Sequence, residues 1–196
     1  MPNINSAKKR LRQSLVRRAR NRSVKATLKT HVKKVRSEIE AGNIEGANAA
    51  LREAQVKLDR AYIGSCTGGK TSDFLEFARV VRGRRVSIDT FGVPATPEIV
   101  HDLQTAHWDG QTVWDILTTA GVQMTENAGC AACLGGPVDT FGRMNAPLKC
   151  ISATNRNFPG RMGHKDSQVF LASPATVAAS AVAGKITDPR ELPPKS

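Results

Sequence analysis

The chain has 196 residues, of which 40% are hydrophobic, so it can form one ordinary domain and a small appendage but not several domains. It contains 29 Lys and Arg residues against 17 Asp and Glu residues, a formal net charge of +12, and such an excess predicts a polyanionic partner. The sequence shows neither the apolar region of a secretory signal nor an apolar run of about 20 residues, which a membrane span needs. We therefore expect a soluble, cytoplasmic protein with no membrane partner.

The excess positive charge lies almost entirely in the first third of the chain. Residues 1–61 contain 16 basic and 5 acidic residues, a net charge of +11, whereas residues 62–196 contain 13 and 12, a net charge of +1. Residues 1–37 contain no Asp or Glu, so these cations have no acidic partner one helical turn away. The pattern favours binding of an external anion; the alternative is an ordinary solvated helix face.

A long helix is predicted at the N-terminus. Residues 7–41 contain neither proline nor glycine, and the run begins after Ser6, a residue type that often precedes helices. Apolar residues recur every three or four positions and form a narrow stripe along this helix. Gly42 should end it, and residues 44–60 should form a second helix with a matching apolar face. We expect the two helices to fold back as a basic hairpin over residues 1–61.

Beyond residue 61 the sequence pattern alternates between helix and strand, which is typical of α/β proteins. The predicted helices cover residues 72–81, 97–106, 111–120 and 174–183, and the predicted strands cover residues 85–90, 148–152 and 169–172. The predicted fold class is therefore α/β, with a basic helical hairpin in residues 1–61 and a second domain in residues 62–196.

The basic segment has a recognisable pattern. The string NINSAKKR at residues 3–10 is followed by basic clusters at residues 17–22 and 33–36. With the break at Gly42 and the alanine-rich second helix, this pattern resembles the ribosomal protein S-twenty family of the bacterial small subunit. The resemblance implies that residues 1–61 bind 16S ribosomal RNA or the ribosome, and cations on several helix faces suit contact with RNA backbones. The expected RNA-binding residues are Lys8, Lys9, Arg10, Arg12, Arg17, Arg18, Arg20, Arg22, Lys25, Lys29, Lys33, Lys34 and Arg36.

All four cysteines lie in the second domain. Cys66 is followed by Gly68 and Gly69, while Cys130 and Cys133 form a Cys-x-x-Cys pair between Gly129 and Gly135. The spacing alone is compatible with a redox pair, a zinc site or an iron–sulfur site. The neighbouring glycines favour an iron–sulfur cluster, because they let backbone N–H groups approach an anionic centre. Cys150 has no such neighbour and is expected to be a small buried strand residue; a zinc site formed by all four cysteines is the alternative.

These cysteine segments, with the loop SATNRNFPGRMG at residues 152–163 and the segment at residues 171–180, resemble the large subunit of 3-isopropylmalate dehydratases in the aconitase superfamily. The resemblance covers residues 62–196 and implies a truncated aconitase-type α/β/α domain. It implies that three ligands, Cys66, Cys130 and Cys133, hold a 4Fe-4S cluster with one open iron, which can act as a Lewis acid. It also implies that Asn155, Arg156 and Arg161 bind a hydroxy-dicarboxylate substrate.

The resemblance also implies partners. In the family, a separate small subunit and an N-terminal large-subunit region supply further active-site groups, including the base. We therefore expect a cluster-binding fragment of a hydro-lyase of leucine biosynthesis that is poorly active or inactive alone, and no catalytic residue is assigned to this chain. One alternative is a ribosomal RNA-binding protein that carries the dehydratase part as a passenger. Another is a gene rearrangement that yields no stable product.

Overall fold

The computed structural model describes residues 4–108, 110–156 and 160–193, without the side chains of residues 5–10, 13, 16–21, 23–25, 53 and 54. The chain forms two compact units, Met1–Gln55 and Val56–Ser196. They are called unit 1 and unit 2 below and are described separately. No helix in the described part of the chain has the length and apolar character needed to cross a membrane.

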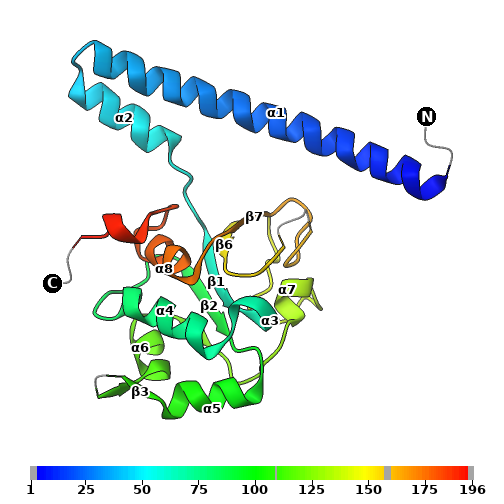
Figure 1. The fold of residues 1–196 in the computed structure, drawn as a ribbon, viewed down its shortest axis with the longest axis vertical. Coiled ribbons are helices and arrows are strands. Elements are labelled where there is room, and N and C mark those ends of the chain that lie inside the picture. The colour runs from blue at the N-terminus through cyan, green and yellow to red at the C-terminus, as the bar shows by residue number, and fades with distance from the viewer. Residues whose placement is uncertain (1–3, 109, 157–159, 194–196) are drawn as a thin grey trace. The chain divides into compact units, whose positions relative to one another are not determined.

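Unit 1 consists of two helices. Helix α1 spans Asn5–Glu40 and α2 spans Ile44–Ala54, and the two helices contact each other (Figure 1). The turn between them contains Gly42 in the left-handed conformation, and the Asn43 side chain accepts a hydrogen bond of 2.9 Å from the Gly46 N–H, which caps α2. Of the described side chains in this unit, only Ala50 is buried.

The second helix is shorter than predicted. It was expected over residues 44–60, but it ends at Ala54 because the following segment belongs to unit 2. The Leu58 N–H donates to the Gly184 carbonyl at 3.0 Å, and the Leu58 side chain is buried in the core of unit 2. The expected boundary after residue 61 therefore lies after Gln55 in the structure.

Unit 2 is built on a five-stranded parallel sheet with the strand order β5-β2-β1-β6-β7. The strands are β1 (Arg60–Gly64), β2 (Asp89–Val93), β5 (Gln123–Met124), β6 (Lys149–Ser152) and β7 (Gln168–Leu171). The longer helices are α4 (Thr71–Val81), α5 (Pro97–Thr105), α6 (Val113–Thr119) and α8 (Pro174–Ala183). The short elements are α3 (Ser65–Gly68), α7 (Ala131–Leu134), the 3-10 helix η1 (Pro189–Glu191) and a pair of two-residue strands, β3 (His107–Trp108) and β4 (Gln111–Thr112).

The two faces of the sheet are covered differently. Alternate residues of β1 point to opposite faces: Ala61 and Ile63 join one core with the four longer helices, whereas Tyr62 joins another. Figure 1 shows α4, α6 and α8 together beside the sheet. In the described residues, the second face is covered by α7 and by loop residues such as Met144 and Met162. The α/β class is confirmed. The resemblance implied an α/β/α domain with helices on both faces of the sheet, but the described residues that cover the second face lie mostly in loops.

Most of the predicted elements are present within two residues of their expected ends. The main error concerns residues 85–90, because the strand begins only at Asp89. The preceding residues instead donate backbone hydrogen bonds to helix ends, from Val86 to the Ala120 carbonyl and from Ser87 to the Ala181 carbonyl, both at 2.9 Å. The central strand β1 and the short strand β5 were not predicted.

Candidate metal centre

Cys66 follows the carboxyl end of the central strand. The chain turns sharply from β1 into α3 at Gly64, whose φ is 149°, and a Cβ at this position would lie 2.3 Å from the Val93 carbonyl oxygen. Ser65 has a φ of 66°, an unusual value for a non-glycine residue. Its hydroxyl lies 2.9 Å from the Tyr62 hydroxyl, and both residues are fully buried. This supported turn places Cys66 at the carboxyl edge of the sheet.

The Cys-x-x-Cys pair is attached to the neighbouring strand. Cys130 immediately precedes α7, and Cys133 lies within it. The Gly129 N–H donates to the Pro94 carbonyl at 2.9 Å, just after β2 ends, so the pair is anchored at the same sheet edge as Cys66. After α7, Gly135 takes the left-handed conformation and ends the helix.

Of the three predicted ligand residues, Cys130 interacts with both of the others. The backbone N–H of Cys66 donates to Cys130 Sγ at 3.0 Å. The pKa of the Cys66 thiol lies below its usual value, mainly because of hydrogen bonding with Cys130, and the charge of Arg161 contributes. Burial raises the pKa of Cys130, and the side-chain hydrogen bond with Cys66 and the charges of Cys66 and Cys133 raise it further, whereas the Cys66 backbone N–H lowers it. The structure thus brings together thiols that are 64 residues apart in the chain.

A zinc site formed by all four cysteines does not fit this arrangement. In the described residues, no three or more His, Cys, Asp or Glu side chains gather closely enough to hold a metal ion. A tetrahedral zinc ion with bonds of about 2.3 Å would keep its sulfur ligands about 3.8 Å apart. Cys150 is fully buried in β6, its thiol donates to the Ile151 carbonyl at 3.4 Å, and burial raises its pKa to about 12. The zinc alternative with four cysteines is therefore not supported.

The chemistry of the three thiols fits an iron–sulfur cluster better. All are free cysteines, and thiolates are the usual ligands of such clusters. N–H groups are aimed at two of the sulfurs, from Cys66 to Cys130 and from Arg161 Nη2 to Cys133, both at 3.0 Å. Gly68 lets the segment after Cys66 pack against the loop after β6, since a Cβ at this position would lie 2.4 Å from the Ala153 carbonyl oxygen. A cubane cluster is wider than a single ion, so it does not require the thiols to meet at one point.

The three predicted substrate residues lie in different environments. Asn155 and Arg156 are exposed on the loop after β6, whereas Arg161 is only 8% exposed and contacts Cys133. Residues 157–159, between them, lie outside the described residues. A carboxylate could therefore reach the first two side chains from solvent, while Arg161 adjoins the cysteines.

Comparison with known proteins identifies the family of this chain. The aconitase (aconitate hydratase) family model matches residues 8–184. The chain belongs to the aconitase family. It is 46% identical over 178 residues to the chloroplastic 3-isopropylmalate dehydratase large subunit of Arabidopsis thaliana, with 88% of this chain and 35% of the relative covered. The large subunits of Campylobacter fetus and Pyrobaculum islandicum are 43% and 44% identical, with 76% and 72% of this chain and 34% and 32% of each relative covered.

This aconitase-family chain spans about a third of the length of the curated relatives it matches. The similarity also reaches into the basic segment. The family match begins at residue 8. The Arabidopsis alignment covers 88% of the chain, whereas residues 62–196 are only 135 of its 196 residues, so the alignment must include part of residues 1–61. These comparisons support a fragment resembling a dehydratase large subunit and give no support to a ribosomal segment fused to it.

The predicted RNA-binding residues all belong to α1. Those with described side chains are exposed: Arg12, Arg22, Lys29, Lys33, Lys34 and Arg36. The side chains of the others lie outside the described residues: Lys8, Lys9, Arg10, Arg17, Arg18, Arg20 and Lys25. The described part of α1 therefore presents its cations to solvent.

Sequence reasoning missed several residues that support the cysteine segments of this family member. Tyr62 and Ser65 hold the turn before Cys66. Arg143 Nε donates to the Gly136 carbonyl at 2.7 Å and so fixes the loop that follows Cys133, while Arg60 donates to the Arg143 carbonyl at 2.8 Å. No local pattern identifies these residues, because each acts through one contact that depends on the folded chain.

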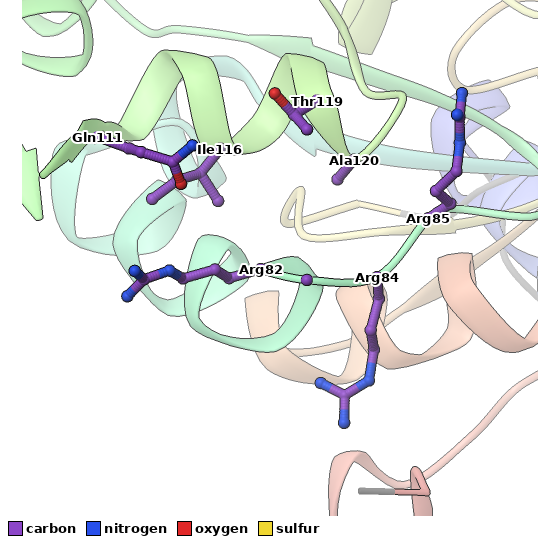
Figure 2. A pocket seen from close by; sticks show the side chains of 8 residues that line it. Arg82, Arg84, Arg85, Gln111, Ile116, Thr119 and Ala120 are labelled. Atoms are coloured by element: carbon purple, nitrogen blue, oxygen red, sulfur yellow. The ribbon is translucent and has the colours of Figure 1, made fainter. Parts of the chain in front are cut away.

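A cavity of about 290 Å³ lies beyond the carboxyl end of α4, away from the cysteines. Its lining residues are Arg82, Gly83, Arg84, Arg85, Gln111, Ile116, Thr119 and Ala120. Figure 2 shows that the three arginine side chains point in different directions, so they do not converge on one anion. Arg84 also donates to the Val80 and Pro193 carbonyls at 2.8 and 2.7 Å. We assign this cavity no part in the chemistry of the family.

Proposed function

We propose that this chain is the cluster-binding part of a 3-isopropylmalate dehydratase-type hydro-lyase, in which Cys66, Cys130 and Cys133 hold a 4Fe-4S cluster. The observation that carries the proposal is that two separate cysteine segments meet at one sheet edge, where the Cys66 N–H is directed at the Cys130 sulfur and Arg161 at the Cys133 sulfur. The identity to dehydratase large subunits supports the same reaction class.

The residues around the cysteines suit a hydroxy-dicarboxylate substrate. When bound, a cluster with three protein ligands supplies an open iron that acts as a Lewis acid towards a substrate hydroxyl. Arg156 and Asn155, both exposed on the loop after β6, are placed to bind a carboxylate, for which the planar guanidinium is well suited. Arg161 contributes positive charge beside Cys133. A dehydration also needs a base for the carbon-bound proton, so we propose that a small subunit and further large-subunit segments complete the site.

Anaerobic reconstitution with ferrous iron and sulfide tests the proposal. The wild-type chain should gain about four irons per chain and a thiolate-to-iron absorbance band. The Cys130→Ser variant should lose most of both, because one ligand is removed. The matched control is Cys150→Ser, which changes a thiol buried in β6 and should keep the cluster. A wild-type chain that takes up only zinc, or no metal, would contradict the proposal.

We propose RNA binding by α1 as a second candidate function. The specific observation in its favour is that exposed cations line the described part of α1, and that the first 37 residues of the chain include no acidic residue. Affinity for 16S ribosomal RNA fragments should then fall by about 0.9 log units per log unit of salt for each neutralised phosphate.

Charge variants can test this second function. Replacing Lys29, Lys33, Lys34 and Arg36 together by Gln should weaken binding and lower the salt slope. Replacing Arg85 and Lys165, which are exposed cations of unit 2, by Gln is the control. Equal affinity for RNA in the two variants would argue against α1 as the binding element.

A further inference from the structure

Arg161 contacts the sulfur of a proposed cluster ligand. We propose that Arg161 is a positioning residue for Cys133, whose sulfur it holds by a hydrogen bond, and that this bond raises the reduction potential of the cluster. The assignment rests on the proposed cluster function. It gives Arg161 a role towards the ligand sulfur itself, in addition to any contact with substrate.

The contact joins two segments that are 28 residues apart in sequence. Arg161 Nη2 donates to Cys133 Sγ at 3.0 Å, and the two residues are only 8% and 1% exposed. A sulfur acceptor allows longer contacts than oxygen does, so 3.0 Å is a short hydrogen bond for this pair. Because both groups are buried, water competes little for the bond, and a charged donor strengthens it.

The backbone around Arg161 is fixed in an unusual shape. Gly160, Met162 and Gly163 have φ values of 80°, 65° and 130°, so three residues of this four-residue segment are in conformations that favour glycine. Met162 is not a glycine and is fully buried, which indicates local strain maintained by its surroundings. Its carbonyl accepts from the Met144 N–H at 2.8 Å. A backbone held this firmly keeps the Arg161 side chain directed inwards.

The same turn packs directly against the cysteine segment. A Cβ at Gly135, two residues after Cys133, would lie 3.1 Å from the Gly163 nitrogen and 3.4 Å from the Gly160 carbonyl oxygen. A Cβ at Gly163 would lie only 2.2 Å from the Met144 carbonyl oxygen. Glycines therefore permit the close approach of the two loops, and this approach places the guanidinium on the sulfur.

The effect on the cluster follows from charge. Reduction adds one negative charge to the cluster and its thiolates, and a cationic N–H donor at a ligand sulfur stabilises the more negative state. Loss of the bond should therefore lower the equilibrium constant for reduction about tenfold, which corresponds to 59 mV for one electron.

The test measures the midpoint potential of the anaerobically reconstituted chain. Arg161→Gln should lower the equilibrium constant for reduction about tenfold, because the charge at Cys133 is removed. Arg161→Lys keeps the charge and should lie between this variant and wild type. The control is Lys165→Gln, which removes a cation whose side chain is exposed and has no role in the proposed site, and which should leave the potential unchanged.

A second measurement needs no variant that could misfold. In wild-type protein with ¹⁵N-labelled arginine, pulsed EPR of the reduced cluster should detect hyperfine coupling to a guanidinium nitrogen. Absence of this coupling, or equal potentials in Arg161→Gln and wild type, overturns the role of Arg161 while the cluster function stands. Failure of the wild-type chain to take up any cluster overturns both proposals.

Discussion

The two units of this chain differ in how their helices are stabilised. In unit 2, helix α4 buries Phe74, Phe77, Ala78 and Val81 against the sheet and α8. In unit 1, α1 has 36 residues, yet its described leucines are between 44% and 57% exposed. Helices in proteins derive most of their stability from the burial of an apolar face. Unit 2 therefore has its own hydrophobic core, whereas the described side chains of unit 1 bury little apolar surface.

Amide hydrogen exchange should reveal the largest difference. If the α4 amides exchange only through global unfolding of unit 2, and the free energy of unfolding is about 5 kcal/mol or more, their exchange should be slowed on the order of 10³–10⁴-fold. The α1 amides should be protected far less, because few apolar contacts must break for the helix to open. Exchange measured by mass spectrometry on peptides from both helices checks this. Equal protection in α1 and α4 would show that unit 1 has a source of stability beyond its described contacts.

Truncation of apolar residues should give the next largest difference. Phe77→Ala in α4 should lower the free energy of unfolding of unit 2 by about 3–5 kcal/mol, because Phe77 is fully buried. Leu28→Ala in α1 should change the free energy of unfolding of unit 1 by about 0.5 kcal/mol or less, because Leu28 is 57% exposed. Urea denaturation followed by circular dichroism measures both. A loss above about 2 kcal/mol for Leu28→Ala would mean that this leucine is buried in solution, for example in an oligomer.

Features that depend on neighbouring residues in the chain could be predicted from the sequence. Helix α8 was predicted with the observed ends, because Ser173 and Gly184 cap it through local interactions. The cysteine segments were found because glycines flank them in the sequence itself. Strand β1 was missed, since its residues are buried on both faces and show no alternation of apolar and polar residues.

Contacts between distant segments could not be predicted in the same way. Nothing around Arg161 indicates that it reaches Cys133, because the contact depends on how the two loops pack at Gly135 and Gly163. The left-handed Ser65 is likewise set by Tyr62 and by the tight turn at Gly64 rather than by its own residue type. The sequence therefore predicts which segments carry the chemistry, while the folded chain decides which side chains meet there.

Two glycines, one in each unit, differ in how closely the surrounding backbone approaches them. Gly64 and Gly42 both have positive φ, but a Cβ at Gly64 would lie 2.3 Å from the Val93 carbonyl oxygen, whereas one at Gly42 meets nothing within 4 Å. Gly64→Ala should therefore lower the free energy of unfolding by about 1–3 kcal/mol and reduce iron uptake. Gly42→Ala should cost only about 1 kcal/mol through backbone strain, without affecting iron uptake. Denaturation curves and iron analysis of both variants provide the measurement, and equal iron uptake would contradict the role of Gly64.

The smallest effect is expected at an ion pair on the surface of unit 2, in which Arg190 is exposed and Asp188 is partly exposed. Arg190 Nη2 lies 2.5 Å from Asp188 Oδ2, and its hydrogen bonds lower the pKa of Asp188 from 3.8 to about 2. Because the pKa is depressed in the folded state, the stabilisation is fully present above the unfolded value and is lost as the pH falls through about 2. Arg190→Gln should return the pKa towards 3.8, as followed by NMR titration of the Asp188 carboxyl group.

The stabilities of wild type and Arg190→Gln should accordingly differ slightly at neutral pH and converge as the acid range is entered. Solvent screens an exposed pair, so the difference should also shrink with added salt. A difference that persists below pH 2 would show that the effect of Arg190 does not depend on the Asp188 carboxylate. A difference at neutral pH that rivals the effect of Phe77→Ala would show that surface charge contributes as much to the stability of unit 2 as the buried core. The contrast with unit 1, where exposed cations are the dominant feature, would then lose its physical basis.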